Sequence, residues 1–299
     1  MKIVLSLFLL FALFSTALPH GNNSHFSTQQ DVVVKISKVN GSVYILQGRG
    51  GNVGALVGTD GILIVDDDYK QVSEKLAAAL KELGSATPRY VLNTHWHGDH
   101  TEGNEFFGKT STIVAHANVR KRFLNPPVIF GQRTAPYAEF ALPILTYTES
   151  MSIYFSGEEV RLVHYPSGHT DGDTVVFFKG SNVIHLGDDF FVGRFPFVDI
   201  DSGGSVQGLI NNIGSLLSTI PADAKLIPGH GPVSTHADLK TYHAMLIDTA
   251  RIVQDAMKAG KSLDDIKKAG LPEKYNEAGA GFIKTPAWIE TIYRSYSAK

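Results

Sequence analysis

The sequence predicts an α/β protein whose two halves each run from a meander of short strands into a helix. Short segments rich in β-branched residues alternate with glycine-containing turns, which is typical of antiparallel strands. Longer segments with apolar residues three or four positions apart follow them, which is typical of helices packed on a sheet. The chain has 299 residues, 43% of them hydrophobic, so it can bury a sizeable core as one large domain or two small ones.

Four strands open the first half and are separated by Asn-Gly, Gly-rich and Asp-Gly turns, which predicts an antiparallel meander. A helix is predicted over Tyr69–Leu83, where apolar residues share one helical face and Gly84 ends the pattern. The strands of this half are predicted at 32–38, 42–47, 53–59, 62–65, 90–93 and 112–115, and two further helices at 102–107 and 117–123.

The second half repeats this order. Its strands are predicted at 151–155, 159–165, 174–179, 182–186 and 225–227. Ser205 is expected to cap a helix over Val206–Ser218, and a long helix is predicted over Ala237–Lys258. Two C-terminal helices, over Ser262–Ala269 and Ala287–Tyr296, are expected to pack on the outside.

Asn125–Leu142 separates the halves and follows neither a helical nor a strand period. Its prolines and aromatic residues suit a lid or rim over a binding site, and they suit equally a loop that plugs the edge of the core. The sequence leaves both interpretations open.

The N-terminus has the pattern of a secretory signal peptide over Met1–Ala17. Lys2 precedes the apolar run Ile3–Phe14, and small residues end the segment. An uncleaved membrane anchor is the alternative, although the apolar run is short for a full span. We expect a disordered leader over 18–30, a single domain over 31–299, no membrane attachment after cleavage, and a periplasmic or secreted mature protein.

Composition excludes several classes of partner and chemistry. The formal net charge is −2 and no basic run is present, so we expect no nucleic-acid partner. The chain contains no cysteine, which excludes disulfides, thiolate ligands and a thiol nucleophile.

Three histidines and an aspartate crowd the segment Thr94–His100, directly after a predicted strand. Buried imidazoles and carboxylates need a compensating partner, and a divalent cation is one. His95 and His97 are two positions apart on extended chain, so both rings point the same way and can hold one metal. Asp99 and His100 follow a glycine that lets the backbone turn, so they can face a second metal. A histidine-rich surface loop is the alternative.

Three other segments place polar residues at the ends of predicted strands. They are Gly168–Gly172, Leu186–Asp189 and Pro228–Pro232. Loops at strand ends gather along one edge of a two-sheet sandwich, so we expect these segments to converge on the histidine cluster.

The four ordered motifs, His-x-His-x-Asp-His, Gly-His-Thr, Gly-Asp and Pro-Gly-His-Gly, resemble those of the metallo-β-lactamase superfamily over about Val32–Leu246. The resemblance implies a four-layer αβ/βα sandwich with two zinc ions at one edge of the sheets. It also implies the role of each ligand: His95, His97 and His169 for the first zinc, Asp99, His100 and His230 for the second, Asp188 as a bridge, and Asp66 as a support behind the histidines.

The resemblance further implies a hydrolase in which a hydroxide held by the two metals attacks the carbonyl of a small-molecule substrate, with Asp99 orienting it. Glyoxalase II and lactonases have aspartate at the Asp188 position, whereas the best known β-lactamase classes have cysteine or serine. A β-lactam, lactone or ester is the expected substrate, and other divalent transition metals are possible. The alternatives are a glyoxalase II-like thioesterase, a phosphodiesterase and a non-catalytic metal-binding protein; the oligomeric state is left open.

Other candidates carry weaker expectations. His116, His164 and His185 lie on predicted strands and are expected to be hydrogen-bonded rather than metal ligands. Trp96 is expected at the core or the rim of the site. Phe190, Phe191, Phe195 and Phe197 follow Asp188, and about half of them are expected to form an apolar pocket wall.

Overall fold

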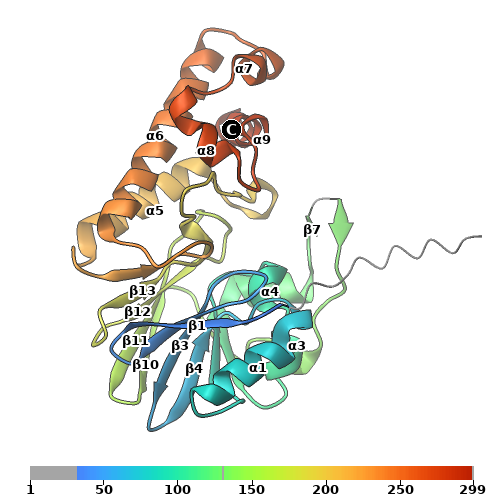
Figure 1. Cartoon of the computed structure of the whole chain (residues 1–299). Coiled ribbons are helices and arrows are strands. Elements are labelled where there is room, and N and C mark those ends of the chain that lie inside the picture. Colours follow the sequence, from blue (N-terminus) through green and yellow to red (C-terminus); the bar gives the residue numbers. More distant parts are fainter. Residues whose placement is uncertain (1–31, 130, 298–299) are drawn as a thin grey trace, which may run out of the picture. The chain divides into compact units, whose positions relative to one another are not determined.

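A seven-stranded sheet forms one half of the centre of the computed structural model, which describes residues 32–129 and 131–297 (Figure 1). Its strands lie side by side in the order β1-β2-β3-β4-β5-β6-β9. They span Lys35–Asn40, Val43–Gln47, Val53–Gly58, Gly61–Val65, Tyr90–Asn93, Thr112–His116 and Leu145–Tyr147. The first four strands form the predicted antiparallel meander, and the remaining neighbours pair in parallel. The short strand β9 was not predicted.

Helices cover the outer face of this sheet. They are α1 (Ser73–Glu82, after the 3-10 turn η1, Lys70–Val72), α3 (Asn104–Phe107) and α4 (Ala117–Leu124). The single turn α2 (Gly98–Thr101) lies beyond the end of β5. Leu76 and Leu80 of α1 pack against Ile62 and Ile64 of β4. The helix predicted at 102–107 begins at Asn104, and the separate helical turn α2, which ends at Thr101, was not predicted.

A five-stranded sheet faces the first one. Its strands run in the order β10-β11-β12-β13-β14, with bounds Ser150–Phe155, Glu158–His164, Thr174–Phe178, Val183–His185 and Lys225–Ile227. Two helices, α5 (Val206–Thr219) and α6 (His236–Lys258), pack on its outer face. The Ser205 side chain accepts a hydrogen bond from the Gly208 amide, so the predicted cap of α5 is confirmed.

The two sheets enclose a continuous apolar core. Leu63, Val65 and Leu92 from the first sheet meet Leu162 and Val176 from the second, and all five are fully buried. The layers therefore run helix, sheet, sheet, helix, which confirms the expected four-layer αβ/βα sandwich. Removal of this apolar surface from water is the main force that holds the layers together.

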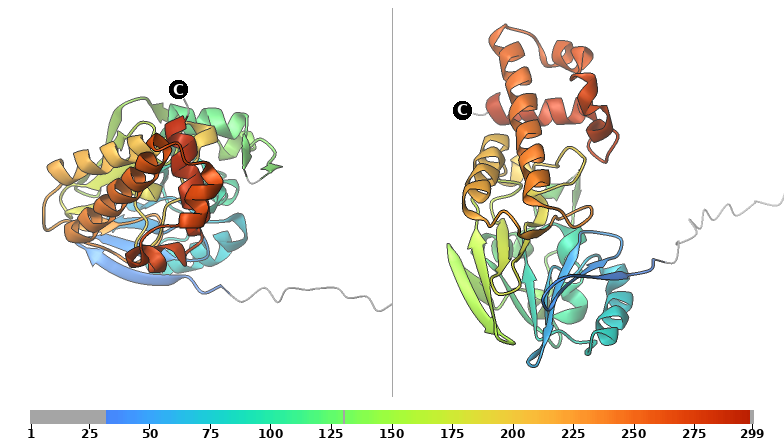
Figure 2. Two further views of the ribbon diagram at one scale, coloured as in Figure 1. Left: turned by 90° about the horizontal axis from the view of Figure 1, so that it is seen from above. Right: turned by 60° about the vertical axis from the view of Figure 1, so that its left-hand side comes forward.

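The C-terminal helices extend the layer that covers the second sheet (Figure 2). They are α7 (Leu263–Ala269), α8 (Asn276–Gly279) and α9 (Thr285–Ser297). The Trp288 ring of α9 is fully buried, stacks on Phe195 at 5.7 Å, and donates a hydrogen bond from Nε1 to Thr249 of α6. The sequence predicted that these helices lie outside the sheet, but α9 also completes the core beneath them.

The loop over Asn125–Leu142 contains a small hairpin of β7 (Val128–Ile129) and β8 (Gln132–Arg133), which projects from the sandwich (Figure 1). Tyr137 fixes the end of the loop, because its ring stacks on Phe123 at 4.2 Å and its hydroxyl lies 3.0 Å from the Thr101 hydroxyl.

The predicted signal peptide and leader lie outside the described residues. Within the described part of the chain, every helix is too short or too polar to cross a membrane.

Candidate metal centre

Four loops bring the seven predicted ligands to one edge of the sandwich. His95 and His97 follow β5, and Asp99 and His100 begin α2. The other three come from the second sheet: His169 precedes β12, Asp188 lies in the 3-10 turn η3 (Gly187–Asp189) after β13, and His230 follows β14.

The first group of donor atoms comprises His95, His97, His169 and one oxygen of Asp188, all within 4.8 Å of one another. His169 Nε2 lies 2.7 Å from His97 Nδ1 and 3.5 Å from Asp188 Oδ2. His95 Nε2 lies 3.9 Å from the same oxygen. All four side chains are buried.

The second group comprises Asp99, His100 and His230. His230 Nε2 lies 3.2 Å from Asp99 Oδ2 and 3.4 Å from His100 Nε2. The other oxygen of Asp188, Oδ1, lies 3.0 Å from His100 Nε2 and 3.6 Å from His230 Nε2. Asp188 therefore turns one oxygen to each group, so that it could be shared by two cations.

Hydrogen bonds on the far side of the His97 and His169 rings indicate that the two ring nitrogens facing each other are unprotonated. His169 Nδ1 lies 2.6 Å from the Phe197 carbonyl and His97 Nε2 lies 3.2 Å from Asp199, so both of these nitrogens carry the proton. The nitrogens that face each other at 2.7 Å then both present lone pairs, which repel unless a cation lies between them.

His95 supports the same conclusion, because its Nε2 is buried and has no hydrogen-bond partner among the described residues. Leaving such a group unsatisfied costs about 1–3 kcal/mol, which a bound cation would offset. Imidazole nitrogens with carboxylate oxygens and no thiolate suit zinc, and they also accept other divalent transition metals. The residues present therefore fit the expected metals.

Asp66 supports both groups from behind. Its Oδ1 accepts a hydrogen bond from the Thr94 amide at 2.7 Å, and its Oδ2 lies 2.7 Å from His100 Nδ1. The Thr94 hydroxyl donates to Asp66 at 2.8 Å and lies 3.0 Å from His95 Nδ1. This network fixes the rings of one ligand from each group.

Asp199 is a functional residue that the sequence did not predict. It holds the His97 ring, yet it lies 102 positions away in the chain. It closes the segment that begins at Asp188, and no motif spacing distinguishes it from other aspartates. Only the folded path of that segment brings it back to the site.

Neighbouring opposite charges in the metal centre shift the pKa values of its histidines and aspartates. Burial would lower the pKa of His230, but Asp188 and Asp99 outweigh burial and raise this pKa to about 9. Burial would raise the pKa of Asp188, but His100 and His230 hold it well below the usual range. The Asp188 carboxylate thus stays ionised, the form in which it can bind a cation.

The centre opens into a cavity of about 730 Å³. The loop over 125–142 contributes Pro126, Pro127 and Tyr137 to its wall, so this loop forms a rim of the site. The other lining residues include Trp96, Phe191, Arg194, Phe195, Phe197, Phe282 and Ile283. Of the four phenylalanines after Asp188, Phe190 is the one that belongs to the core alone.

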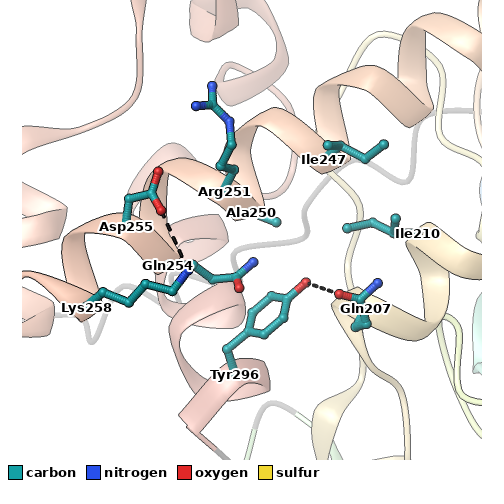
Figure 3. A pocket seen from close by; sticks show the side chains of 9 residues that line it. All are labelled: Gln207, Ile210, Ile247, Ala250, Arg251, Gln254, Asp255, Lys258 and Tyr296. Carbon is teal, nitrogen blue, oxygen red and sulfur yellow. Dashed lines mark hydrogen bonds and ion pairs between the residues drawn. The ribbon is translucent and has the colours of Figure 1, made fainter.

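A second pocket, of about 190 Å³, lies between α5, α6 and α9 (Figure 3). Its charged groups are neutralised locally, since Lys258 lies 3.9 Å from Asp255 and Arg251 pairs with Asp248. The Tyr296 hydroxyl donates to Gln207 at 3.0 Å. None of the predicted metal ligands lines this pocket.

The fold and the paired donor groups are those of a metallo-hydrolase. The family model of the metallo-beta-lactamase superfamily matches residues 39–230, a range that contains all seven predicted ligands. The chain therefore belongs to the metallo-beta-lactamase superfamily. The helices α7 to α9 lie beyond the matched range.

Individual relatives agree with this assignment. A hydroxyacylglutathione hydrolase of Rhodospirillum rubrum is 26% identical over 207 residues, which cover 67% of this chain and 68% of the relative. The probable metallo-hydrolase YqgX of Bacillus subtilis is 27% identical over 179 residues, covering 59% and 83%.

Solved structures support the fold. The DIM-1 metallo-beta-lactamase superposes with a TM-score of 0.60 at 17% identity and covers 73% of this chain and 99% of its own. The sec-alkylsulfatase Pisa1 from Pseudomonas sp. superposes with a TM-score of 0.64 at 13% identity. That match covers 88% of this chain but only 50% of the sulfatase.

Proposed function

We propose that this chain is an exported dinuclear zinc hydrolase that cleaves a carbonyl compound such as a β-lactam, a lactone or an ester. The position of Asp188 carries the proposal, because its two oxygens face two separate groups of nitrogen and oxygen donors. A single cation would need only one of these groups.

His95, His97 and His169 would hold one cation, Asp99, His100 and His230 the other, and Asp188 both. When bound, two divalent cations polarise a carbonyl oxygen and lower the pKa of water to about 7. The five imidazole nitrogens and the carboxylate oxygens of this donor set suit zinc.

Asp99 is suited to position the attacking water molecule. Its side chain is 24% exposed, so it meets the cavity while its Oδ2 stays beside His230. A carboxylate oxygen there can accept a hydrogen bond from the water and fix its orientation toward a carbonyl carbon. Burial would raise the pKa of Asp99, but His100 and His230 outweigh burial and keep the carboxyl ionised.

A thioesterase is the second candidate. The Rhodospirillum rubrum relative supports it, because that protein is named a hydroxyacylglutathione hydrolase. Aspartate at position 188 suits this class as well as the lactonases. Hydrolysis of phosphodiesters and metal binding without catalysis are weaker alternatives, and the lack of a basic run argues against a nucleic-acid substrate.

Export rests on the apolar run Ile3–Phe14 after Lys2. Expression of the full chain in a bacterial host, followed by N-terminal sequencing of the periplasmic and culture fractions, tests it. A mature N-terminus shortly after Ala17 supports export, and an intact chain in the cytoplasm contradicts it.

Elemental analysis and substrate assays test the activity. We expect two equivalents of zinc and hydrolysis of at least one of nitrocefin, a homoserine lactone or S-lactoylglutathione, with loss of activity in chelator. Bis-p-nitrophenyl phosphate reports the phosphodiesterase alternative. Asp248→Asn serves as a control for variants of the metal centre, because this surface aspartate pairs with Arg251 and Lys274 away from the centre and its loss should leave activity unchanged. Metal-free protein or inactivity on every compound contradicts the proposal.

A further inference from the structure

The loop over residues 48–52 joins β2 to β3 and lies against the second group of predicted ligands. Its sequence is Gly-Arg-Gly-Gly-Asn, and it contains no predicted ligand. The sequence identified it only as a glycine-rich turn. In the structure it connects His100 with the segment of His230, 130 positions away in the chain.

Close packing on the ligand segment explains two of the loop's glycines. A Cβ added at Gly51 would overlap the His100 ring, and a Cβ added at Gly50 would overlap the Asp99 carbonyl oxygen. The Gly51 amide also donates a hydrogen bond to the Asp99 carbonyl at 2.9 Å. Neither glycine has a positive φ, so close approach rather than backbone conformation requires them. The loop therefore presses directly on two ligands.

Asn52, the last residue of the loop, binds the segment that carries His230. Its backbone amide donates to the Gly229 carbonyl at 2.8 Å. Its Nδ2 donates to the Pro228 carbonyl at 2.8 Å and to the Gly231 carbonyl at 2.9 Å. One buried residue therefore holds carbonyl groups on both sides of His230.

The neighbours of Asn52 fix the orientation of its amide group. Gln47 Nε2 lies 3.2 Å from the Gly231 carbonyl, which can only accept, so this nitrogen also donates to Asn52 Oδ1 at 3.0 Å. The Gly187 amide donates to His185 Nδ1, so His185 Nε2 carries the proton and donates to the Asn52 carbonyl at 3.0 Å. A residue held in this way can fix the spacing of the segments that it joins.

Asp68 holds the other end of the loop. Its buried carboxylate accepts hydrogen bonds from the Arg49 amide at 3.0 Å and from the Gly50 amide at 2.8 Å. A third bond, from the Tyr69 amide at 2.6 Å, ties the carboxylate to its own segment after β4. The loop is thus fixed at both ends.

We infer that Gly51 and Asn52 are positioning residues for the second group of ligands. Gly51 fixes the His100 ring. Asn52 fixes the segment that carries His230, and the spacing of the two sets the affinity of this group for its cation. The inference rests on the proposed binding of two cations. The rings of the first group are held by a different segment, which follows Asp188.

Asn52→Asp tests the contact with the His230 segment. Aspartate keeps the shape of the side chain but places an acceptor oxygen against the two carbonyls, so both bonds are lost. Titration of metal-free protein with Zn²⁺, in competition with a chromogenic chelator, gives two binding constants. The constant of the second group, identified by its loss in His230→Gln, should fall about tenfold or more, and that of the first group should change by less than about twofold. Excess Zn²⁺ should refill the second group.

Asn40→Asp is the matched control. The Asn40 amide also donates to a backbone carbonyl of the second half, that of Ser181 at 2.8 Å, but from the turn at the opposite end of β2. Neither binding constant should change in this variant. An equal loss in Asn40→Asp and Asn52→Asp would mean that any contact between the halves controls the affinity, which overturns the inference. An unchanged second constant in Asn52→Asp overturns it as well.

Gly51→Ala tests the loop from its other side. The new Cβ must displace the His100 ring, so the second constant should fall more than the first. In Gly58→Ala the new Cβ would overlap the Ser156 side chain at the far end of β3, and both constants should stay unchanged. The losses in Gly51→Ala and Asn52→Asp should combine less than additively, because both disturb one spacing. Equal losses in Gly51→Ala and Gly58→Ala contradict the role of Gly51.

Hydrogen exchange of the metal-free proteins gives a measurement that does not depend on zinc. Exchange at 228–231 should be faster in Asn52→Asp than in the wild type, and exchange at 94–98 should be the same in both. If Asn52→Asp does not fold, Gln47→Met takes its place, because it removes the donor to Asn52 and to Gly231. The second constant should then fall by a smaller factor, and an unchanged constant overturns the inference.

The metal titrations separate this inference from the proposed function. If the protein binds two zinc ions, the second in an Asn52-dependent manner, but cleaves none of the test compounds, the inference stands and the proposed reaction fails. If the protein cleaves a test compound and the second constant is the same in the wild type and in Asn52→Asp, the inference fails alone.

Discussion

The two groups of predicted ligands at the metal centre differ in their access to solvent. The side chains of His95, His97 and His169 are at most 7% exposed. In the other group His100 is fully buried, but Asp99 is 24% and His230 is 22% exposed. Both of these line the cavity, as does His97 of the first group. The first group is therefore the more enclosed of the two, and the second is the more exposed to solvent.

The supports behind the rings differ in the same way. His97 and His169 are held by Asp199 and by the Phe197 carbonyl, both from the segment after Asp188. His230 instead stacks on the Phe191 ring at 5.4 Å, a contact that fixes the plane of the ring less strictly than a hydrogen bond. If each group binds a cation, as we propose, the first group should hold its cation more firmly than the second.

Removal of the residue that joins the groups should have the largest effect. We predict that Asp188→Ala lowers kcat/KM by more than about 100-fold, because an electrostatic contact to the reacting site is lost, and that His97→Ala does the same. Steady-state assays on folded protein, checked by circular dichroism, measure this. Retention of more than about a tenth of the wild-type rate would contradict the assigned roles.

Asp66 is the support that the two groups share, and its substitution should have the second largest effect. Asp66→Asn keeps the shape of the side chain, and asparagine tolerates the φ of +63° at this position. The affinity for both cations should fall about 10- to 100-fold, because outer hydrogen bonds orient the ligands. Competition with a chromogenic chelator measures each affinity.

Asp199→Asn is the matched variant for this test. The Asp199 side chain hydrogen-bonds the His97 ring and the Ser202 amide, and within the described part of the chain it makes no bond to a ligand of the second group, so the change should weaken the enclosed group and spare the other. If Asp66→Asn and Asp199→Asn gave the same pattern of metal affinities, the two groups would not have separate supports.

The two groups should lose their metals at different rates when a chelator is added. We predict that chelator extracts the cations in two phases, and that the first comes from Asp99, His100 and His230, since the cavity exposes this group. His230→Gln should remove the fast phase and leave the slow one. A single phase in both proteins would show that exposure does not control release.

The seven residues predicted as ligands lie close together in the structure, but local sequence explains only part of this grouping. His95 to His100 are adjacent in the chain, so local spacing alone groups them. His169, Asp188 and His230 were expected there from their positions at strand ends and from the resemblance. Asp199 reaches His97 only through the folded path of a long segment, which a local pattern does not specify. The same reason explains why the inner face of α9 was missed, because the burial of Trp288 depends on α6 and Phe195, far away in sequence.

His116 and His164, which lie outside the metal centre, show that two adjacent histidines do not by themselves form a metal site. The rings of His116 and His164 stack at 3.8 Å, but backbone groups satisfy them. His116 Nε2 donates to the Thr148 carbonyl at 3.0 Å and His164 Nδ1 to the Asp173 carbonyl at 2.8 Å. The prediction that these strand histidines are hydrogen-bonded is confirmed.

This pair should give the smallest effect, a dependence of stability on pH. Burial lowers the pKa of both histidines. The charge of the His164 ring lowers the pKa of His116 further, and Asp171 partly opposes the shift of both residues. The unfolded chain takes up protons below about pH 6.5 while the folded pair stays neutral, so the free energy of unfolding falls as the pH drops. The slope is at most about 1.4 kcal/mol per pH unit for each histidine.

His164→Phe isolates this contribution, because phenylalanine keeps a stacked ring that does not titrate. Denaturant unfolding of both proteins from about pH 7.5 to about pH 5.5 should show a smaller loss of stability in the variant. The metal centre is the same in both proteins, so its own titration cancels in the difference between the two curves. If the two proteins lost stability with pH to the same extent, the pKa values of the pair would be ordinary in the folded chain. Burial on these strands would then not lower them.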